Sequence, residues 1–503
     1  MTGLRSPTIA AVPAMVLLAM AGCGPDRPEG ARLTVTVVGG GDRPGGVARR
    51  LVAEATQPTL VARDGNGDTV AGLATSWRFV DDGRSLILRL RPVKWSDGKP
   101  LVADDVVAAF RRAAGRREAA TIDAGIANAG AIASRALPAA RLGVLAPIAR
   151  VVEIRLDAPS PLLLGWLAEP ALGVVRAASP RKSATPPPTL AAYAASGPPE
   201  LRVLKRFAMA ASPDARPAEI SIAVSSDARA AVADFVAGRQ DIVIGEGLAG
   251  LGEARVGARA DALRLDPLWG VYGYLVNSRS GPTADAGVRR ALAMAIDRPA
   301  LAGSFGLATI QPATGLVPSP AGATPDWLRL DYDGRLLAAR QLLAAAGWTA
   351  ERPLRLVLLL PPGRDHRAVA ERVGADWARI NVLLAVTDVE AEPYDKLVAR
   401  GDFDLAVREA SLPVPDAAAL LSRFRCGAGP HCNPAADALL AAARAAAPGD
   451  RARLLAEAEA ALLAAPPLIP LFTPVRWALV SRRVDGWLPN SAGSHPLARL
   501  AAR

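Results

Sequence analysis

The stretch WSDGKPLVADDVVAAFRR, residues 95–112, places three carboxylates within nine positions. Such a group could hold a metal ion or act as a general acid and base. Asp97 precedes a glycine, as in a tight turn, whereas Asp104 and Asp105 fall in the first turn of a helix that apolar spacing predicts from Ala103. The helix dipole favours an ionised carboxylate there, while a general acid must stay protonated. We therefore interpret the three acids as structural.

Other residue patterns give no stronger signal for catalysis or for a resident metal. The sequence has no HExxH, G-x-S-x-G, Walker or strand-end G-x-G-x-x-G motif. RDGNGDTVAG, residues 63–72, has the alternating oxygens of a calcium loop, but Thr69 and Thr75 replace its glycine and glutamate, so a turn is predicted. The histidines are scattered, at positions His366, His431 and His495. The sequence thus predicts a protein that is not an enzyme and has no metal or cofactor.

Cys426 and Cys432 stand in FRCGAGPHCNP, a short Gly/Pro loop. In an exported protein such a pair favours a disulfide, which loop entropy makes worth about 2 kcal/mol. The alternative is a metal site that includes His431. Zinc needs four ligands or three plus water, and His431 directly beside Cys432 is poorly placed to chelate the same ion. We favour the disulfide.

The N-terminus predicts export. TIAAVPAMVLLAMAG, residues 8–22, is uncharged and too short to span a bilayer comfortably, as in a signal peptide. Met20-Ala21-Gly22-Cys23 then resembles the bacterial lipobox, which implies a diacylglycerol anchor on Cys23. An ordinary secretory signal with an incidental cysteine is the alternative. No later run reaches 18 uncharged apolar residues, so we expect a mature chain anchored by lipid in the periplasm or cell envelope.

Length and charge exclude some partners. A chain of 503 residues allows two to four domains. Its 59 Lys and Arg exceed its 48 Asp and Glu, but the excess is spread along the chain and aromatic residues make up only 4%. Nucleic-acid binders usually show basic stripes between stacking residues, so no nucleic-acid partner is predicted.

Hydrophobic periodicity predicts an α/β chain built in two similar halves. Strands are expected at 33–38, 84–91, 151–157, 218–224, 240–245, 353–360 and 383–389, with extended chain at 466–472. Helices are expected at 103–114, 227–238, 288–297, 336–347 and 366–380, and a helix pair at 434–465.

Several of these segments resemble one family in the same order. GLATSWRFVDDGRSLILRLRPVKWSDGKPLVADDVVAAFRR, residues 72–112, looks like its signature, and LVNSRSGPTADAGVRRALAMAIDR, residues 275–298, resembles a later block. GLVPSP, LLAAAGW, CNPAADALLAAA and PPLIPLF continue the series. The family is the extracytoplasmic solute-binding proteins of ABC importers, family 5, which bind oligopeptides, dipeptides, nickel and related solutes.

The resemblance implies a two-lobed periplasmic-binding-protein fold of the large class, with an extra subdomain in lobe I and a ligand cleft between the lobes. It places Asp297 and Arg298 in a structural helix-end ion pair or cap. The expected divisions are a signal peptide at 1–22, a tether at 23–31, lobe I at 32–262, lobe II at 263–473 and a return to lobe I at 474–503.

The ligand site is expected on two facing segments. WGVYGYLVN offers Trp269, Tyr272 and Tyr274, while AVREASLPVPDAAALL offers Arg408, Glu409 and Ser411. The aromatic residues could equally be lobe II core, and alternation predicts that Tyr272 and Tyr274 share one environment. The family's peptide binders place an acid at the position of Ser411 to hold the peptide ammonium group. A hydroxyl offers no counter-charge, so either Glu409 substitutes after a two-residue shift or the ligand lacks a free amino terminus.

The function that the resemblance implies is capture of a peptide-like or other small polar solute and its delivery to an ABC permease. A monomer is expected. The alternative is an envelope scaffold or sensor derived from such a protein, with altered or no ligand binding. A cleft filled by the protein's own side chains would favour that alternative.

Overall fold

The computed structural model describes residues 32–39, 46–176, 188–207, 217–318 and 322–502. The predicted signal peptide, Cys23 and the tether lie outside the described residues. Within the described part of the chain, no helix is both long and apolar enough to cross a bilayer.

Lobe I is built on a seven-stranded sheet in the order β12-β18-β11-β1-β10-β9-β8. At its centre β1 (Arg32–Val38) runs parallel to β10 (Glu219–Ser225) and β11 (Ile242–Gly245). These strands carry the alternating or continuous apolar residues that predicted them. The remaining strands are β8 (Tyr193–Ser196), β9 (Leu201–Arg206), β12 (Leu263–Pro267) and β18 (Val475–Val480), and the helices of this part are α1 (Val47–Thr56), α6 (Ala228–Val236) and α7 (Leu251–Gly257).

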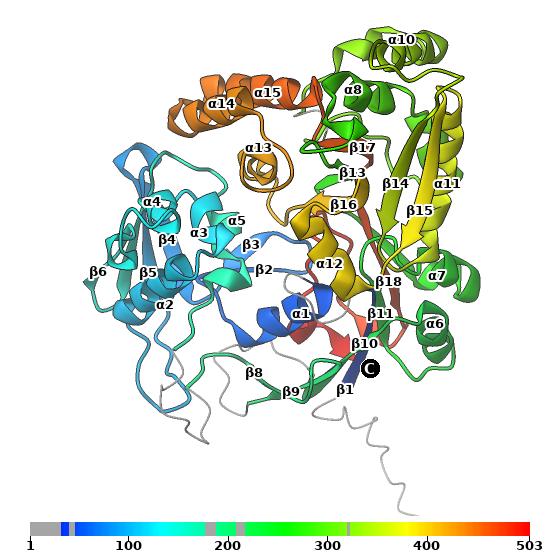
Figure 1. The fold of residues 1–503 in the computed structure, drawn as a ribbon. Coiled ribbons are helices and arrows are strands. Elements are labelled where there is room, and N and C mark those ends of the chain that lie inside the picture. Colours follow the sequence, from blue (N-terminus) through cyan, green and yellow to red (C-terminus); the bar gives the residue numbers. More distant parts are fainter. Residues whose placement is uncertain (1–31, 40–45, 177–187, 208–216, 319–321, 503) are drawn as a thin grey trace, which may run out of the picture.

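The predicted extra subdomain is a four-stranded antiparallel sheet, β4-β5-β7-β6, at the left of Figure 1. The helix predicted at 103–114 is α2 (Ala103–Gly115), whose apolar face is buried against this sheet. The strands are β4 (Ala74–Val80), β5 (Ser85–Leu90), β6 (Val144–Ile148) and β7 (Val151–Arg155), and the short helices are α3 (Ala119–Asp123), α4 (Ala129–Ala133) and α5 (Leu163–Leu167). The turn predicted within residues 63–72 joins a hairpin, β2 (Val61–Arg63) and β3 (Thr69–Ala71), and in it Asp64 accepts hydrogen bonds from backbone amides.

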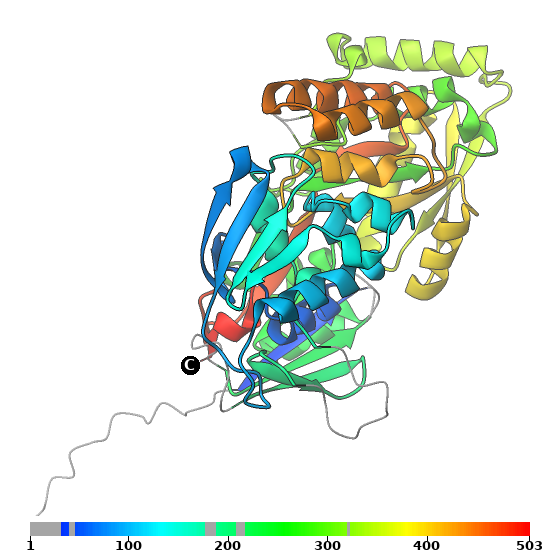
Figure 2. The same ribbon diagram turned by 90° about the vertical axis from the view of Figure 1, so that its left-hand side faces the viewer.

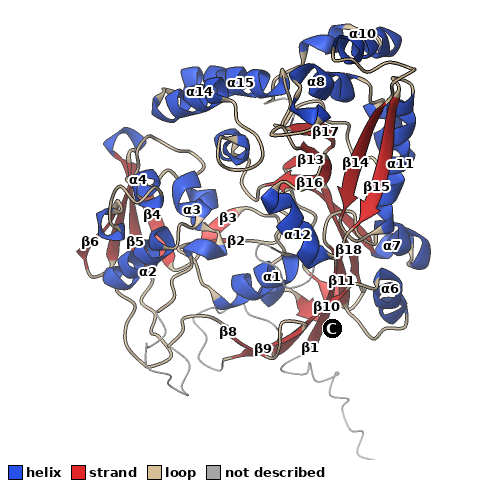
Figure 3. Cartoon of the chain, viewed as in Figure 1, coloured by secondary structure: helices blue, strands red, loops and turns tan. Residues whose placement is uncertain are grey.

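Lobe II is built on a five-stranded sheet, β15-β14-β16-β13-β17, flanked by helices. Figures 2 and 3 show it above lobe I, with the strands in its interior. Its strands are β13 (Gly270–Val276), β14 (Leu354–Leu360), β15 (Val382–Asp388), β16 (Leu405–Ser411) and β17 (Leu468–Phe472). Its helices are α8 (Ala286–Met294), α9 (Arg298–Ser304), α10 (Tyr332–Ala345), α11 (Arg364–Ala378), α12 (Ala391–Arg400), α13 (Ala417–Leu421), α14 (Pro434–Ala445) and α15 (Pro448–Leu463).

Two short connections join the lobes. β12 pairs with β18 in the lobe I sheet, and the chain passes on to β13 of the lobe II sheet at 268–269. It returns at 473–474, between β17 and β18. The lobe boundaries at 262 and 474 stay predictions from the sequence. The backbone N–H of Leu268 donates to the carbonyl of Pro474 at 2.9 Å, so the two connections lie side by side.

The acids of the opening stretch have structural partners. Asp105 accepts from the backbone of Val102 and from Trp95 Nε1, at 3.2 and 3.0 Å. Arg176 forms ion pairs with both Asp97 and Asp105 and lies over the Trp95 ring. Asp104 is exposed at the start of α2. These contacts position the start of α2 on its sheet.

Of the expected helix-end ion pair or cap, the structure shows the cap. Asp297 accepts from the backbone of Ala300 and thereby caps α9. Arg298 is 1% exposed and donates to the carbonyls of Pro470 and Ala293. The arginine therefore joins α8 and α9 to β17 through backbone acceptors rather than through a carboxylate.

Candidate functional site

A cavity of about 930 Å³ lies between the two lobes. Ligand sites for small molecules commonly enclose about 300–1,000 Å³. Lobe I contributes the segment after β11, around Glu246 and Gly247, together with Arg476 of β18. Lobe II contributes β13, β16, α12, the start of α11 and the loop after α13. The cleft is therefore not filled by the protein's own side chains.

The centre of the site is the antiparallel pair β13 and β16. Tyr272 lies opposite Glu409, and Gly270 lies opposite Ser411. Because Glu409 and Ser411 are two positions apart on one strand, their side chains lie on the same face. The Ser411 hydroxyl and Glu409 Oε1 are 3.1 Å apart, so the hydroxyl donates to the carboxylate. The polar pair thus forms one unit at the cavity wall.

Four of the six predicted ligand-binding residues line the cavity, namely Tyr272, Arg408, Glu409 and Ser411. The other two are not among the described lining residues. Trp269 is half-buried and packs between the subdomain core and the core under α14 and α15. Tyr274 is fully buried in the lobe II core with its ring edge-on to Trp377.

Tyr272 and Tyr274 are both buried in the lobe II core, as expected for side chains on one face of a strand. They differ at the cavity, which Tyr272 lines and Tyr274 does not. Its ring is stacked on Phe472, with centroids 4.6 Å apart, and its hydroxyl lies 2.8 Å from His366 Nδ1. Burial raises the pKa of Tyr272 well above its usual value, so the phenol stays protonated. Tyr272 therefore provides a fixed wall rather than a charge.

Sequence reasoning missed most of the lining residues, among them His366, Glu246 and Arg476. Burial lowers the pKa of His366 to about 4, so its imidazole is neutral at neutral pH. Glu246 directly follows the buried strand β11, and the carboxyl ends of parallel strands commonly form ligand clefts. That position was a usable signal for Glu246. His366 and Arg476 had no comparable local signal, because they come from segments far away in the sequence.

Where the two lobes meet at the cavity, two carboxyl groups lie near one guanidinium. Burial lowers the pKa of Arg476, and Glu409 and Glu246 are among the carboxylates that oppose this shift. Arg476 also donates to the carbonyl of Gly493 at 2.6 Å, which fixes its side chain. The group thus places two carboxyl side chains and one guanidinium at the cavity.

The lobes touch at several points around the cavity. A Cβ on Gly247 of lobe I would lie 2.9 Å from Glu409 Oε2 of lobe II. The backbone N–H of Gly252, at the start of α7, donates to Asp365 Oδ1 of α11 at 3.1 Å. Trp166 of the subdomain donates from Nε1 to Asp416 Oδ2 at 3.2 Å. These contacts bring the lobes together over the cavity.

A further interlobe contact is an ion pair with a buried acid. Asp123 of α3, with a side chain only 7% exposed, lies 2.8 Å from Arg423 of the turn Ser422–Phe424. Burial raises the pKa of Asp123 to about 6, and Arg423 opposes this rise. Asp416 adds to the rise because it places a second carboxylate nearby.

We expect the difference in unfolding free energy between an Asp123→Asn variant and wild type to depend on pH, because the Asp123 carboxyl is buried. A carboxyl whose pKa rises on folding stabilises the folded state below about pH 4 and loses this effect as pH rises through about 6. Relative to wild type, the variant should therefore gain about 2 kcal/mol of stability between pH 4 and pH 7. Calorimetric unfolding of both proteins at these pH values checks this. A wild-type-to-variant difference that is constant with pH would contradict it.

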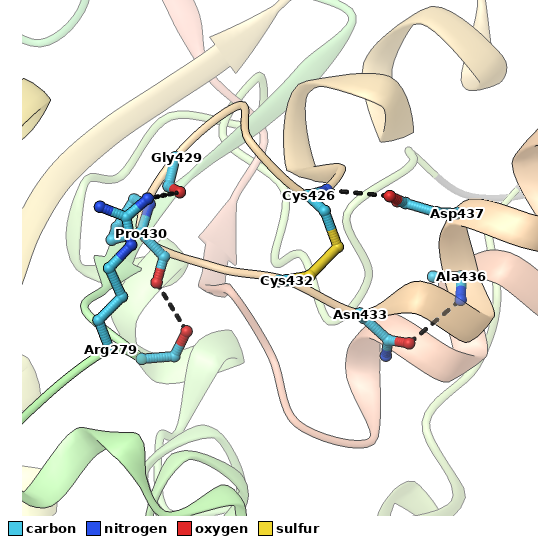
Figure 4. The surroundings of a disulfide bond; sticks show 9 residues. Arg279, Cys426, Gly429, Pro430, Cys432, Asn433, Ala436 and Asp437 are labelled. Atoms are coloured by element: carbon cyan, nitrogen blue, oxygen red, sulfur yellow. Dashed lines mark hydrogen bonds between the residues drawn. A yellow bond between two sulfur atoms is a disulfide. The ribbon is translucent and has the colours of Figure 1, made fainter.

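The structure joins Cys426 to Cys432, as the sequence predicts, and the loop between them lines the cavity. Figure 4 shows the contacts that hold this loop. Asp437 Oδ2 accepts from the backbone of Cys426 at 3.1 Å, and Arg279 Nη2 donates to the carbonyl of Gly429 at 2.9 Å. No group of three metal-ligating side chains occurs anywhere in the described ranges.

The family model for bacterial extracellular solute-binding proteins, family 5, matches residues 68–430. The chain belongs to this family. Its members bind solutes rather than catalyse reactions, and binding a solute for an ABC importer is the function of this family 5 protein.

Curated relatives match this family 5 protein over most of their length. The murein peptide-binding protein MppA of Escherichia coli is 28% identical over 69% of this chain and 68% of its own. The probable deoxycholate-binding protein YgiS of E. coli is also 28% identical, over 82% and 81%. The oligopeptide-binding protein OppA of Salmonella typhimurium is 26% identical over 87% and 84%. All three are named as periplasmic proteins.

Solved structures share the two-lobed fold. The murein tripeptide-binding protein MppA of E. coli superimposes with a TM-score of 0.83 at 24% identity, over 94% of this chain and 98% of its own. Haemophilus influenzae OppA in complex with the peptide RPPGFSPFR gives 0.82 at 20% identity, over 94% and 99%. The unliganded open form of MppA gives only 0.66, over 94% and 98%.

Proposed function

We propose that this protein captures a peptide-like solute with a free ammonium group in the interlobe cavity. It delivers this solute to the membrane permease of an ABC importer, as a monomer anchored by lipid on Cys23. The observation that carries the proposal is the open cavity, in which the carboxyl groups of Glu409 and Glu246 lie near the guanidinium of Arg476. An ammonium ion that leaves water needs such a counter-charge.

Glu409 takes the role that Ser411 cannot fill. Ser411 stands where the family's peptide binders have an acid, but its hydroxyl donates to Glu409 and so orients a carboxylate two positions away. Since both side chains lie on one face of β16, the shift keeps a negative charge at the same wall. MppA and OppA are named for peptide ligands, which agrees with an amine-bearing solute here.

The cavity also argues against the scaffold alternative, because a retired binding protein has no need for a polar, unfilled cleft. Tyr272, Arg408, Glu409 and Ser411 remain the proposed ligand contacts from the sequence, and Glu246, Arg476 and His366 join them.

The decisive experiment is to express residues 24–503 in the periplasm of a host cell and to purify the protein without denaturant. Bound material is then released and identified by mass spectrometry. We expect stoichiometric small molecules with a primary amine, peptides above all. An empty protein that gains no thermal stability from a broad solute panel would refute the proposal and favour the scaffold.

A further inference from the structure

The end of the lobe I sheet that lies away from lobe II carries a band of exposed basic side chains. β1 begins at this end, and the strand registers put the start of β11 and the ends of β9 and β18 beside it. Figure 1 shows β1 and β9 at the foot of the molecule. We call this band the basic edge, and its residues are Arg32, Lys205, Arg206, Arg239, Arg482 and Arg483.

The carboxylates at this end do not use up the basic groups. The ion pairs there join Glu219 to Arg32, Asp234 to Arg239, Asp241 to Arg483, and Asp261 to both Arg259 and Arg482. The Lys205 side chain forms no ion pair within the described ranges. Exposed ion pairs contribute little to stability, and a guanidinium has five N–H donors. The basic edge can therefore bind a further anion at little cost.

Large apolar side chains are exposed beside the basic edge. Val236, the last residue of α6, is 61% exposed, and Val256, near the end of α7, is 91% exposed. The two helices pack together, since a Cβ on Gly257 would lie 2.7 Å from the Val232 side chain. Binding to a membrane surface combines burial of apolar side chains with attraction of cations to anionic lipids. This end of lobe I offers both.

The predicted lipid anchor would hold this end of the molecule near a bilayer. Arg32 follows Cys23 by nine positions in the sequence. A fully extended chain of this length spans at most about 30 Å. Because Arg32 itself belongs to the basic edge, the anchor keeps the edge within that distance of the bilayer. This closeness favours a membrane over a soluble acidic protein as the partner.

We propose that the basic edge binds the anionic phospholipid head groups of the membrane that carries the anchor. The inference rests on the lipid anchor of the proposed function and goes beyond solute capture. Lobe I then lies on the bilayer by the end away from lobe II, so the interlobe cavity stays clear of the head groups. Each cation near an anionic surface strengthens binding about fivefold, and the attraction falls off within a Debye length of about 8 Å.

The test uses residues 24–503, which lack the lipidated cysteine, and two kinds of vesicle. One contains equal parts of phosphatidylglycerol and phosphatidylcholine, and the other contains phosphatidylcholine alone. Co-sedimentation should show at least about tenfold tighter binding to the anionic vesicles, and about 1 M salt, at which the Debye length is about 3 Å, should abolish it. Absent or equal binding to both vesicles would overturn the proposal. Since no solute is present, this result is independent of the solute-binding experiment.

Double variants locate the contact. Lys205→Gln with Arg482→Gln should weaken binding to the anionic vesicles about 25-fold, because each cation contributes about fivefold. Arg329→Gln with Arg372→Gln removes two exposed arginines of lobe II and the same net charge, and should leave binding unchanged. Lys205→Arg with Arg482→Lys keeps both charges and should bind as wild type does. Equal losses in the two glutamine variants would show attraction to the net charge of the protein alone and would overturn the basic edge as the contact.

Discussion

Replacing Glu409 with glutamine is expected to weaken the binding of trialanine about 100-fold. Removing one partner of a desolvated charge pair costs about 2–5 kcal/mol, and 100-fold corresponds to about 3 kcal/mol. The carboxylate stands at the contact of the two lobes, beside Gly247 and near Arg476. Titration calorimetry of wild type and variant measures the change. N-acetyl-trialanine, which has no ammonium group, should bind wild type as weakly as trialanine binds the variant.

Ser411→Ala is the matched control for this change. It removes one neutral donor to Glu409 and should cost about 1 kcal/mol of binding free energy. Both variants should unfold at nearly the wild-type temperature without ligand, because neither residue belongs to a hydrophobic core. A Glu409→Gln variant that binds trialanine as tightly as wild type would show that the ammonium group is held elsewhere.

Trp477→Ala should lower the free energy of unfolding by about 3–5 kcal/mol, which is the usual cost of truncating a buried tryptophan. The Trp477 side chain is fully buried between the lobe I sheet and the segment after β11, and its Nε1 donates to the carbonyl of Ala249 at 3.0 Å. Gly245 lies directly beneath the ring, since a Cβ there would be 1.9 Å from Nε1. Gly245→Ala should therefore destabilise the protein to a similar extent.

The two changes are expected to be strongly non-additive. Once Trp477 is alanine, the ring no longer excludes a methyl group on Gly245, so the second substitution should cost less than about 1 kcal/mol. Urea unfolding followed by far-ultraviolet circular dichroism measures all four proteins of this cycle. Trp348→Ala, which removes a half-buried tryptophan of lobe II, serves as the comparison. Additive costs would show that the ring and the glycine do not act as one packing unit.

Local sequence patterns predicted the helices and strands but not which strands pair with one another. The strand at 33–38 and the helix at 103–114 appear within a residue of their expected bounds, because alternation and helical spacing are local properties. The residues near 262 do not show that β12 joins the lobe I sheet, because β12 pairs there with β18, which lies more than 200 residues later in the sequence. The residues of β12 and β18 do not by themselves indicate that the two strands pair.

Residues of the site could be predicted only where they lie together on one short segment of the sequence. Glu409 and Arg408 could be predicted because they lie two and three positions before Ser411, which stands at the family's ammonium-binding position on β16. Trp269 and Tyr274 have the same residue types as a binding site, but the packing of other elements decides that they are covered. Arg476 reaches the cavity because the chain returns to lobe I beside it, which periodicity does not show.

The paired connections at 268–269 and 473–474 mean that solute affinity can evolve at a distance from the solute. A binding-competent closed form that is only partly populated weakens the apparent affinity in proportion to its population. The backbone hydrogen bond from Leu268 to Pro474 links the two connections, and neither residue lines the cavity, so a substitution there can shift that population without altering a lining residue. Selection can thus change how readily the protein binds and releases its solute while the residues that contact the solute stay the same.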